Sequence, residues 1–218
     1  MKGTKVFRIL GLIYLLCSVF IVIFPMDCHS KKPARDVCVV IDPGHGGGDP
    51  GGGPAADGAT WEKTLNLQRA RELKSSLGIQ GIKVYLTRDT DTYMPIDPKR
   101  WKKIKELFST SNSEKKLFIS YHHNASVTHK AKGTETFWRL NHDKYGKEFA
   151  LNVDKRLRGI GIPPSTGMGT QGRNLMILSW DVWLKDVRAK AILTEICFLD
   201  NQDDWSLYNS PSFTEKIA

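Results

Sequence analysis

The sequence predicts a three-layer α/β fold, a single domain in which helices flank a central, mostly parallel or mixed sheet. Apolar runs of strand length alternate with segments whose apolar residues recur at helical spacing, which is the pattern of such folds. The chain has 218 residues, of which 40% are hydrophobic and 25% charged. This composition is ordinary for a globular protein, and the length suits one substantial domain.

The elements follow one another in a regular order. Strands are expected where the apolar runs have β-rich composition, at 37–42, 82–87, 117–122, 134–140, 175–178 and 191–196. One helix, ending near Gly78, is expected from the spacing of Leu67, Ala70, Leu73 and Leu77. A second, ending before Gly159, is expected from Tyr145, Phe149, Val153 and Leu157. The segment 159–172 is rich in Gly, Pro, Ser and Thr and is predicted to be a long surface loop, of the kind that often borders a substrate groove.

The N-terminal segment differs from the rest of the chain. Three basic residues precede an uncharged run, 9–24, which is longer than the core of a usual signal peptide and shorter than a comfortable membrane span. Residues 1–28 are therefore interpreted as a signal peptide or an N-terminal membrane anchor, 29–35 as a linker and 36–218 as the folded domain. Either interpretation predicts export to the periplasm or cell envelope.

The charge and the cysteines exclude some classes of protein. The net charge is +9, but six basic residues against two acidic ones fall within the first 37 positions, so the remainder is only modestly basic. The basic tract 99–105 is interpreted as a solvated helix face, and no nucleic-acid partner is expected. The cysteines form no CxxC pair, and Cys38 and Cys197 lie in strand-like runs where apolar packing is expected.

Residues able to bind a metal follow these strands. His45 comes after the first predicted strand within a glycine-rich loop, Glu62 opens the first helix just after Thr60, a candidate N-cap, and His122 ends the third strand. Two histidines and a glutamate can hold a catalytic zinc ion with one position open. Glu195, in the last strand, can then transfer protons.

Six motifs in order carry a resemblance to a known family. They are the stretches beginning at Ile41 (IDPGHGG), Glu62 (EK), Leu86 (LTRDTD), Ile119 (ISYHHNA), Gly133 (GTET) and Leu193 (LTEICFL). Over about residues 37 to 205 the chain resembles the zinc-dependent N-acetylmuramoyl-L-alanine amidases. The resemblance implies that His45, Glu62 and His122 bind Zn²⁺ and that Glu195 is the catalytic glutamate. It also implies that the amide between N-acetylmuramic acid and L-alanine in peptidoglycan is the bond cut. Residues 213–218 look like the first turns of a final helix that relatives continue.

Other polar residues lie in or near these motifs. Because adjacent strand residues point to opposite faces, only one of His122 and His123 can face the metal, and the family's pattern selects His122. His123 is then expected to be a surface histidine, and Glu135 to have a structural role at least as readily as one in the site. Arg88 is expected to pair with Asp89 or Asp91 rather than bind a substrate carboxylate. The remaining histidines, in polar segments, are expected at the surface: His29, His129 and His142.

Three other functions are compatible with parts of the pattern. A non-catalytic peptidoglycan-binding module has no need of Glu195, and a zinc hydrolase acting on another amide is the nearest enzyme alternative. A nucleotide-binding protein is disfavoured because the glycines of 44–53 lack both the GK[ST] ending and the GxGxxG spacing of phosphate loops. The sequence does not indicate an oligomeric state.

Overall fold

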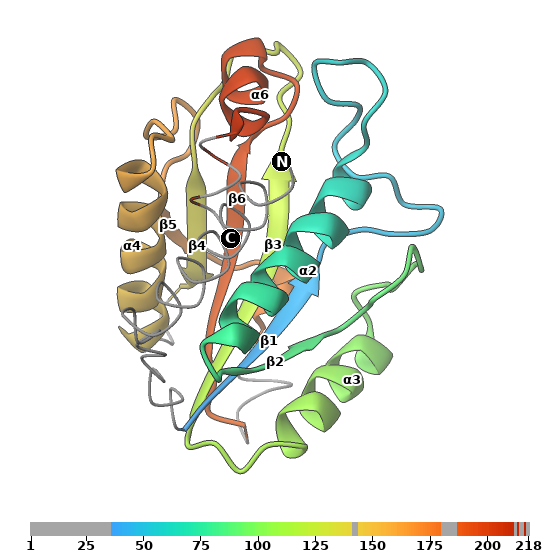
Figure 1. Cartoon of the computed structure of the whole chain (residues 1–218), viewed down its shortest axis with the longest axis vertical. Coiled ribbons are helices and arrows are strands. Elements are labelled where there is room, and N and C mark those ends of the chain that lie inside the picture. The colour runs from blue at the N-terminus through green and yellow to red at the C-terminus, as the bar shows by residue number, and fades with distance from the viewer. Residues whose placement is uncertain (1–35, 141–143, 180–186, 212, 214–215, 217–218) are drawn as a thin grey trace, which may run out of the picture. The chain divides into compact units, whose positions relative to one another are not determined.

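A six-stranded mixed sheet forms the centre of the domain (Figure 1). The computed structural model describes residues 36–140, 144–179, 187–211, 213 and 216. In sheet order, the strands are β2 (Lys83–Leu86), β1 (Val37–Pro43), β3 (Lys115–Asn124), β6 (Lys190–Phe198), β4 (Glu135–Arg139) and β5 (Gln171–Arg173). Neighbours run parallel except for β4 and β6, which are antiparallel. The predicted three-layer α/β class is confirmed.

Helices cover both faces of this sheet, and α2 crosses in front of it in Figure 1. They are α2 (Glu62–Ile79), α3 (Pro98–Ser109), α4 (Lys144–Gly159) and α6 (Gln202–Tyr208), with a short 3₁₀ helix, η1 (Met176–Leu178). The start of α3 is fixed by Asp97, whose side chain accepts hydrogen bonds from the backbone N–H groups of Lys99 and Arg100, with Pro98 as the first helical residue. Both helices predicted from apolar spacing are present.

The alternation of side chains along β1 divides the core into two layers. Cys38 and Val40 face α3 and η1, whereas Val39 and Ile41 face α2 and α6. Cys38 and Cys197 are free and buried, as expected for apolar packing. Because β1 is buried on both faces, its carboxyl end is held firmly, and that end leads into the loop that carries His45.

A buried ion pair fixes the same end of β1 from the α3 side. The carboxylate of Asp42 accepts hydrogen bonds from the Arg100 guanidinium on both oxygens, at 2.8 to 3.0 Å, and from the hydroxyls of Thr87 and Ser120. The Arg100 side chain therefore points into the protein, unlike the exposed lysines of the basic tract 99–105. Lys99, Lys102 and Lys103 stay exposed, as predicted for a solvated helix face.

Two predicted features were wrong. Residues 175–178 were expected to form a strand, but they contain η1, and the edge strand is β5, just before them. A short apolar run does not distinguish the two, and Ile177 and Leu178 bury their side chains in the α3-side core as a helical turn. Thr60 does not cap α2, because its hydroxyl donates to Asp57 and Trp61 occupies the cap position.

Some sequence-based interpretations fall outside the described residues. These are the signal peptide or anchor at 1–28, the linker 29–35, His29, His142 and most of the final helical segment 213–218. Phe213 is described, and its ring is buried against Tyr208. None of the helices in the described ranges has the length and apolar composition needed to cross a membrane.

Candidate metal centre and catalytic cleft

The predicted ligand residues meet at one edge of the sheet. β1, β3 and β6 are parallel, so their carboxyl ends lie together, and the N-terminus of α2 begins beside them. His45 follows β1, His122 lies near the end of β3, and Glu62 is the first residue of α2. Ligand sites in open α/β sheets form at this edge.

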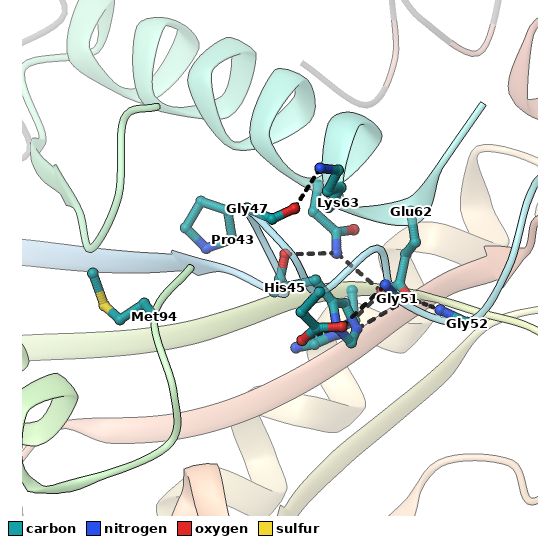
Figure 2. Close-up of polar contacts among 12 residues, drawn as sticks. Pro43, His45, Gly47, Gly51, Gly52, Glu62, Lys63 and Met94 are labelled. Carbon is teal, nitrogen blue, oxygen red and sulfur yellow. Dashed lines mark hydrogen bonds and ion pairs between the residues drawn. The ribbon is translucent and has the colours of Figure 1, made fainter. Parts of the chain in front are cut away.

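Glu62 bridges the two histidines. Its Oε2 lies 3.1 Å from His45 Nε2, and its Oε1 lies 3.1 Å from His122 Nδ1. The two imidazole rings stand almost perpendicular, with centroids 4.9 Å apart. One candidate ligand atom from each residue lies within 4.8 Å of the others. Figure 2 shows Glu62 and His45 directed toward one another, with Gly51 and Gly52 beside them.

Two glycines make this close approach sterically feasible. A Cβ atom on Gly44 would lie 2.1 Å from Cε1 of His122, and one on Gly51 would lie 2.4 Å from Oε2 of Glu62. Gly51 also has a φ of 92°, which side-chain-bearing residues rarely adopt. His45 itself has a φ of 61°, an uncommon backbone conformation of the kind that clusters at functional sites.

The Glu62 carboxylate is saturated with hydrogen-bond donors. Oε1 accepts from the Asn66 side chain at 3.0 Å and from the His123 backbone N–H at 3.1 Å, and Oε2 accepts from the Gly52 N–H at 2.8 Å. Burial alone would raise the pKa of Glu62, but the hydrogen bonds from His122 and His45 outweigh it and hold that pKa well below its usual range. Glu62 is therefore ionised at neutral pH.

The histidines are held by acidic partners. His45 Nδ1 lies 2.9 Å from a carboxylate oxygen of Asp49, which orients the ring with Nε2 toward Glu62. Burial lowers the pKa of His45, yet Glu62 and Asp49 together raise it to about 9. Burial also opposes protonation of His122, but the hydrogen bond with Glu62 raises its pKa. Sequence reasoning missed Asp49, because the two residues lie in a loop, where a spacing of four residues does not by itself indicate a contact.

The three side chains fit a zinc ion. Two imidazole nitrogens and one carboxylate form a common donor set of catalytic zinc sites, which leave a position open. Glu62 and His122 lie in a helix and a strand, and His45 follows directly after buried β1. The glycines remove the atoms that would crowd the centre, and Asp49 and Asn66 provide the outer hydrogen bonds typical of metal sites. The cluster can hold a metal ion.

Glu195 lies beside this cluster. In the sheet it pairs directly with His122 of β3 on one side and with Glu135 of β4 on the other. Its Oε2 is buried and has no hydrogen-bond partner within the described part of the chain. Burial raises the pKa of Glu195 to about 7; His122 opposes this rise, and Glu62 and Glu135 add to it. A carboxyl group with such a pKa can both take and give a proton at neutral pH.

A cleft of 670 Å³ connects these groups to solvent. It is lined by His45, Glu62, His122 and Glu195, by the 51–54 segment, and by the end of β3 and the residues after it (123–127), with His129 and Asp200. His129 is exposed, as predicted, but it also forms part of the cleft rim, where Asp200 accepts a 2.7 Å hydrogen bond from it. Nothing in the sequence pattern had pointed to Asp200.

His123 was wrongly predicted to be a surface residue. Strand alternation turns its ring to the opposite face from His122, where Tyr121 and Tyr208 pack against it and leave it 2% exposed. Its Nδ1 donates to Asn66 Oδ1 at 2.7 Å, and Asn66 in turn donates to Glu62. Burial lowers the pKa of His123 to about 3, so the ring is neutral.

The predicted pairing of Arg88 was also wrong. Asp89 pairs with Arg71 and Asp91 pairs with Lys63, whereas Arg88 is buried and donates to backbone carbonyls. Lys63 also donates to the Gly47 carbonyl, as Figure 2 shows.

Glu135 has the structural role that was one of its expected roles. It accepts hydrogen bonds from Asn124, from Ser165 and from the backbone of the 168–169 turn. It thereby anchors the loop that leads into β5.

Known proteins with similar sequences include proteins named as probable cell wall amidases. The chain is 28% identical over 188 residues to the probable cell wall amidase LytH of Staphylococcus saprophyticus, covering 86% of this chain and 55% of that protein. For LytH of Staphylococcus epidermidis the identity is 26%, with 83% and 54% covered. The chain thus spans about half the length of these relatives.

Solved structures with this fold include amidase catalytic domains. An N-acetylmuramoyl-L-alanine amidase from Clostridium difficile 630 superposes with a TM-score of 0.66 at 28% identity, covering 84% of this chain and 94% of that one. The catalytic domain of CwlV from Bacillus (Paenibacillus) polymyxa var. colistinus gives a TM-score of 0.65 at 27% identity, with 83% and 90% covered. The family model described as N-acetylmuramoyl-L-alanine amidase matches residues 39–218, a range that contains the three clustered side chains and Glu195. The chain therefore belongs to the N-acetylmuramoyl-L-alanine amidase family.

Proposed function

We propose that this protein hydrolyses the amide bond between the lactyl group of N-acetylmuramic acid and the L-alanine of the stem peptide in bacterial peptidoglycan. We further propose that His45, Glu62 and His122 hold a zinc ion for this reaction. The observation that carries the proposal is the convergence of these three side chains in one open cleft with Glu195, one of whose oxygens has no hydrogen-bond partner among the described residues. Family membership supplies the substrate class.

The residues divide the reaction among themselves. The chemistry that zinc supplies in such a site is polarisation of the amide carbonyl and activation of water. Glu195 accepts a proton from the attacking water while the oxygen of that water bonds to the carbonyl carbon. As the carbon–nitrogen bond breaks, Glu195 returns that proton to the departing alanine nitrogen. The products are the free lactyl carboxylate and a stem peptide with a free L-alanine amino terminus.

The N-terminal segment supports a location at the cell envelope. Residues 1–28 combine basic residues with an uncharged apolar run, and we propose that they direct export and then act as an anchor or are removed as a signal peptide. The domain proposed to start at residue 36 then meets peptidoglycan outside the cytoplasm.

The test is release of new L-alanine amino termini from purified peptidoglycan by the purified protein, with chelator and after zinc is restored. Release that chelator stops and zinc restores is the expected result. Zinc binding without release from peptidoglycan would contradict the amidase assignment and favour a binding module or a hydrolase of another amide. Release that persists in chelator would contradict the zinc assignment.

A further inference from the structure

Arg88 is a buried cation held by backbone carbonyls. It lies two residues after β2, and it is 4% exposed. Its guanidinium donates to the carbonyls of Pro43 at 3.0 Å, Gly44 at 2.9 Å, Lys63 at 3.0 Å and Thr90 at 3.1 Å. Within the described part of the chain, none of these hydrogen bonds goes to a carboxylate.

Two of these acceptors adjoin metal-ligand positions. Gly44 immediately precedes His45, and Lys63 immediately follows Glu62. A single guanidinium nitrogen, Nη2, donates to both the Gly44 and the Lys63 carbonyls. Arg88 therefore ties the loop that carries His45 to the first turn of the helix that carries Glu62, two segments separated by the whole 46–61 loop.

The other buried arginine of this region provides a contrast. Arg100 neutralises its charge against the Asp42 carboxylate, the usual way to make a buried guanidinium tolerable. In the described residues the hydrogen bonds of Arg88 go to carbonyl dipoles. Burial lowers its pKa and the charges of Asp42 and Asp91 oppose that fall, and the guanidinium remains charged. Burying a guanidinium without a direct carboxylate partner costs free energy. The geometry that Arg88 imposes explains this arrangement, because its planar fork fixes several acceptors at once.

We propose that Arg88 is a positioning residue that sets the separation of His45 and Glu62 and thereby the affinity of the site for zinc. This inference rests on the zinc site of the proposed function. Lysine at position 88 keeps the charge but lacks the fork, so it cannot hold the Gly44 and Lys63 carbonyls together. Loss of an outer-shell contact of this kind typically weakens metal binding by about 10–100-fold.

The test compares Arg88→Lys with Arg100→Lys as the matched control, since both change a buried arginine near the end of β1. Zinc affinity of the full chain is measured by competition with a chromophoric chelator, and the zinc-induced rise in Tm is measured in parallel. The second readout reports binding even when a variant is partly unfolded. We expect about 10–100-fold weaker zinc binding and a smaller Tm rise for Arg88→Lys, with Arg100→Lys destabilised but close to wild type in zinc affinity.

Two results would overturn the positioning role. One is wild-type zinc affinity in Arg88→Lys, and the other is an equal loss of affinity in Arg100→Lys. A wild-type protein that binds zinc without releasing L-alanine termini contradicts the proposed amidase function instead, so the two failures are distinguishable.

Discussion

Two buried glutamates of the same cleft differ in their hydrogen bonds and in the direction of their pKa shifts. Glu62 receives hydrogen bonds from Gly52, Asn66 and the His123 backbone, and its pKa is held well below the usual range. Glu195 leaves one oxygen without a partner in the described part of the chain, and burial raises its pKa to about 7. Both lie next to His122.

This difference matches the two proposed roles, Glu62 as a metal ligand and Glu195 as a proton carrier. A carboxylate that stays ionised and cannot rotate suits a metal ligand, because its charge and direction are fixed before the metal arrives. A carboxyl group that changes protonation easily suits proton transfer. Pairs of acidic groups whose surroundings push their pKa values apart commonly divide these tasks.

The largest expected effect comes from removing the proton carrier. Glu195→Gln keeps the side-chain shape but cannot accept the proton of water, so we expect kcat for release of L-alanine termini to fall on the order of 10²–10⁴-fold. Zinc stoichiometry should stay at the wild-type value, because Glu195 is not one of the three proposed ligands. Glu148→Gln, an exposed change on α4, is the control. Near-normal turnover in Glu195→Gln would refute the assigned role.

Glu62→Gln should instead act through the metal. Replacing an anionic ligand with a neutral amide removes a direct contact, so we expect zinc affinity to fall by more than the roughly 10–100-fold typical of outer-shell changes. Activity should return in part at high zinc concentration, which distinguishes this variant from Glu195→Gln. Chelator competition and zinc-dependent assays measure the two effects. Unchanged zinc affinity would remove Glu62 from the ligand set.

A smaller effect is expected from weakening the support of Glu62. Asn66→Leu has similar volume but removes the donor to Glu62 and the acceptor of His123. We expect zinc affinity to fall about tenfold, with kcat at saturating zinc nearly unchanged. Gln68→Leu, at an exposed position on the same helix, is the control. If both variants bind zinc as the wild type does, the Asn66 contact does not orient the ligand.

The sequence was sufficient for the strand ends and for the residues placed on them. Long apolar runs placed β1, β3 and β6, and the residues that follow such strands meet at one edge because parallel strands end together. The convergence of His45 and His122 was therefore predictable from their positions near strand ends, and that of Glu62 from its place at the start of α2 and from the family resemblance.

The residues that support the ligands were not predictable in the same way. His123 is buried because Tyr208, 85 positions further along the chain, covers its face of the sheet, and no local pattern encodes that contact. Arg88 donates to backbone carbonyls, which every residue possesses, so the sequence does not indicate which residues are its partners. The strand predicted at 175–178 was wrong for a different reason, since four apolar residues fit a strand and a buried helical turn equally well.

The smallest expected effect concerns stability and has opposite signs at the two glutamates. The Glu195 oxygen that lacks a partner in the described ranges costs free energy in the folded state, and Glu195→Met removes that cost in a side chain of similar length. In chelator, we expect Glu195→Met to raise the free energy of unfolding by about 1 kcal/mol, which corresponds to a Tm increase of about 2–4 °C. Glu62→Met should lower Tm under the same conditions, because it leaves the N–H donors of Asn66 and Gly52 without an acceptor. Thermal unfolding followed by circular dichroism measures both, and a loss of stability in Glu195→Met would mean that its carboxylate is satisfied in solution. Glu195→Met should therefore gain stability and lose turnover. This stability–activity trade-off is expected where a polar group is left unpaired because the reaction requires it.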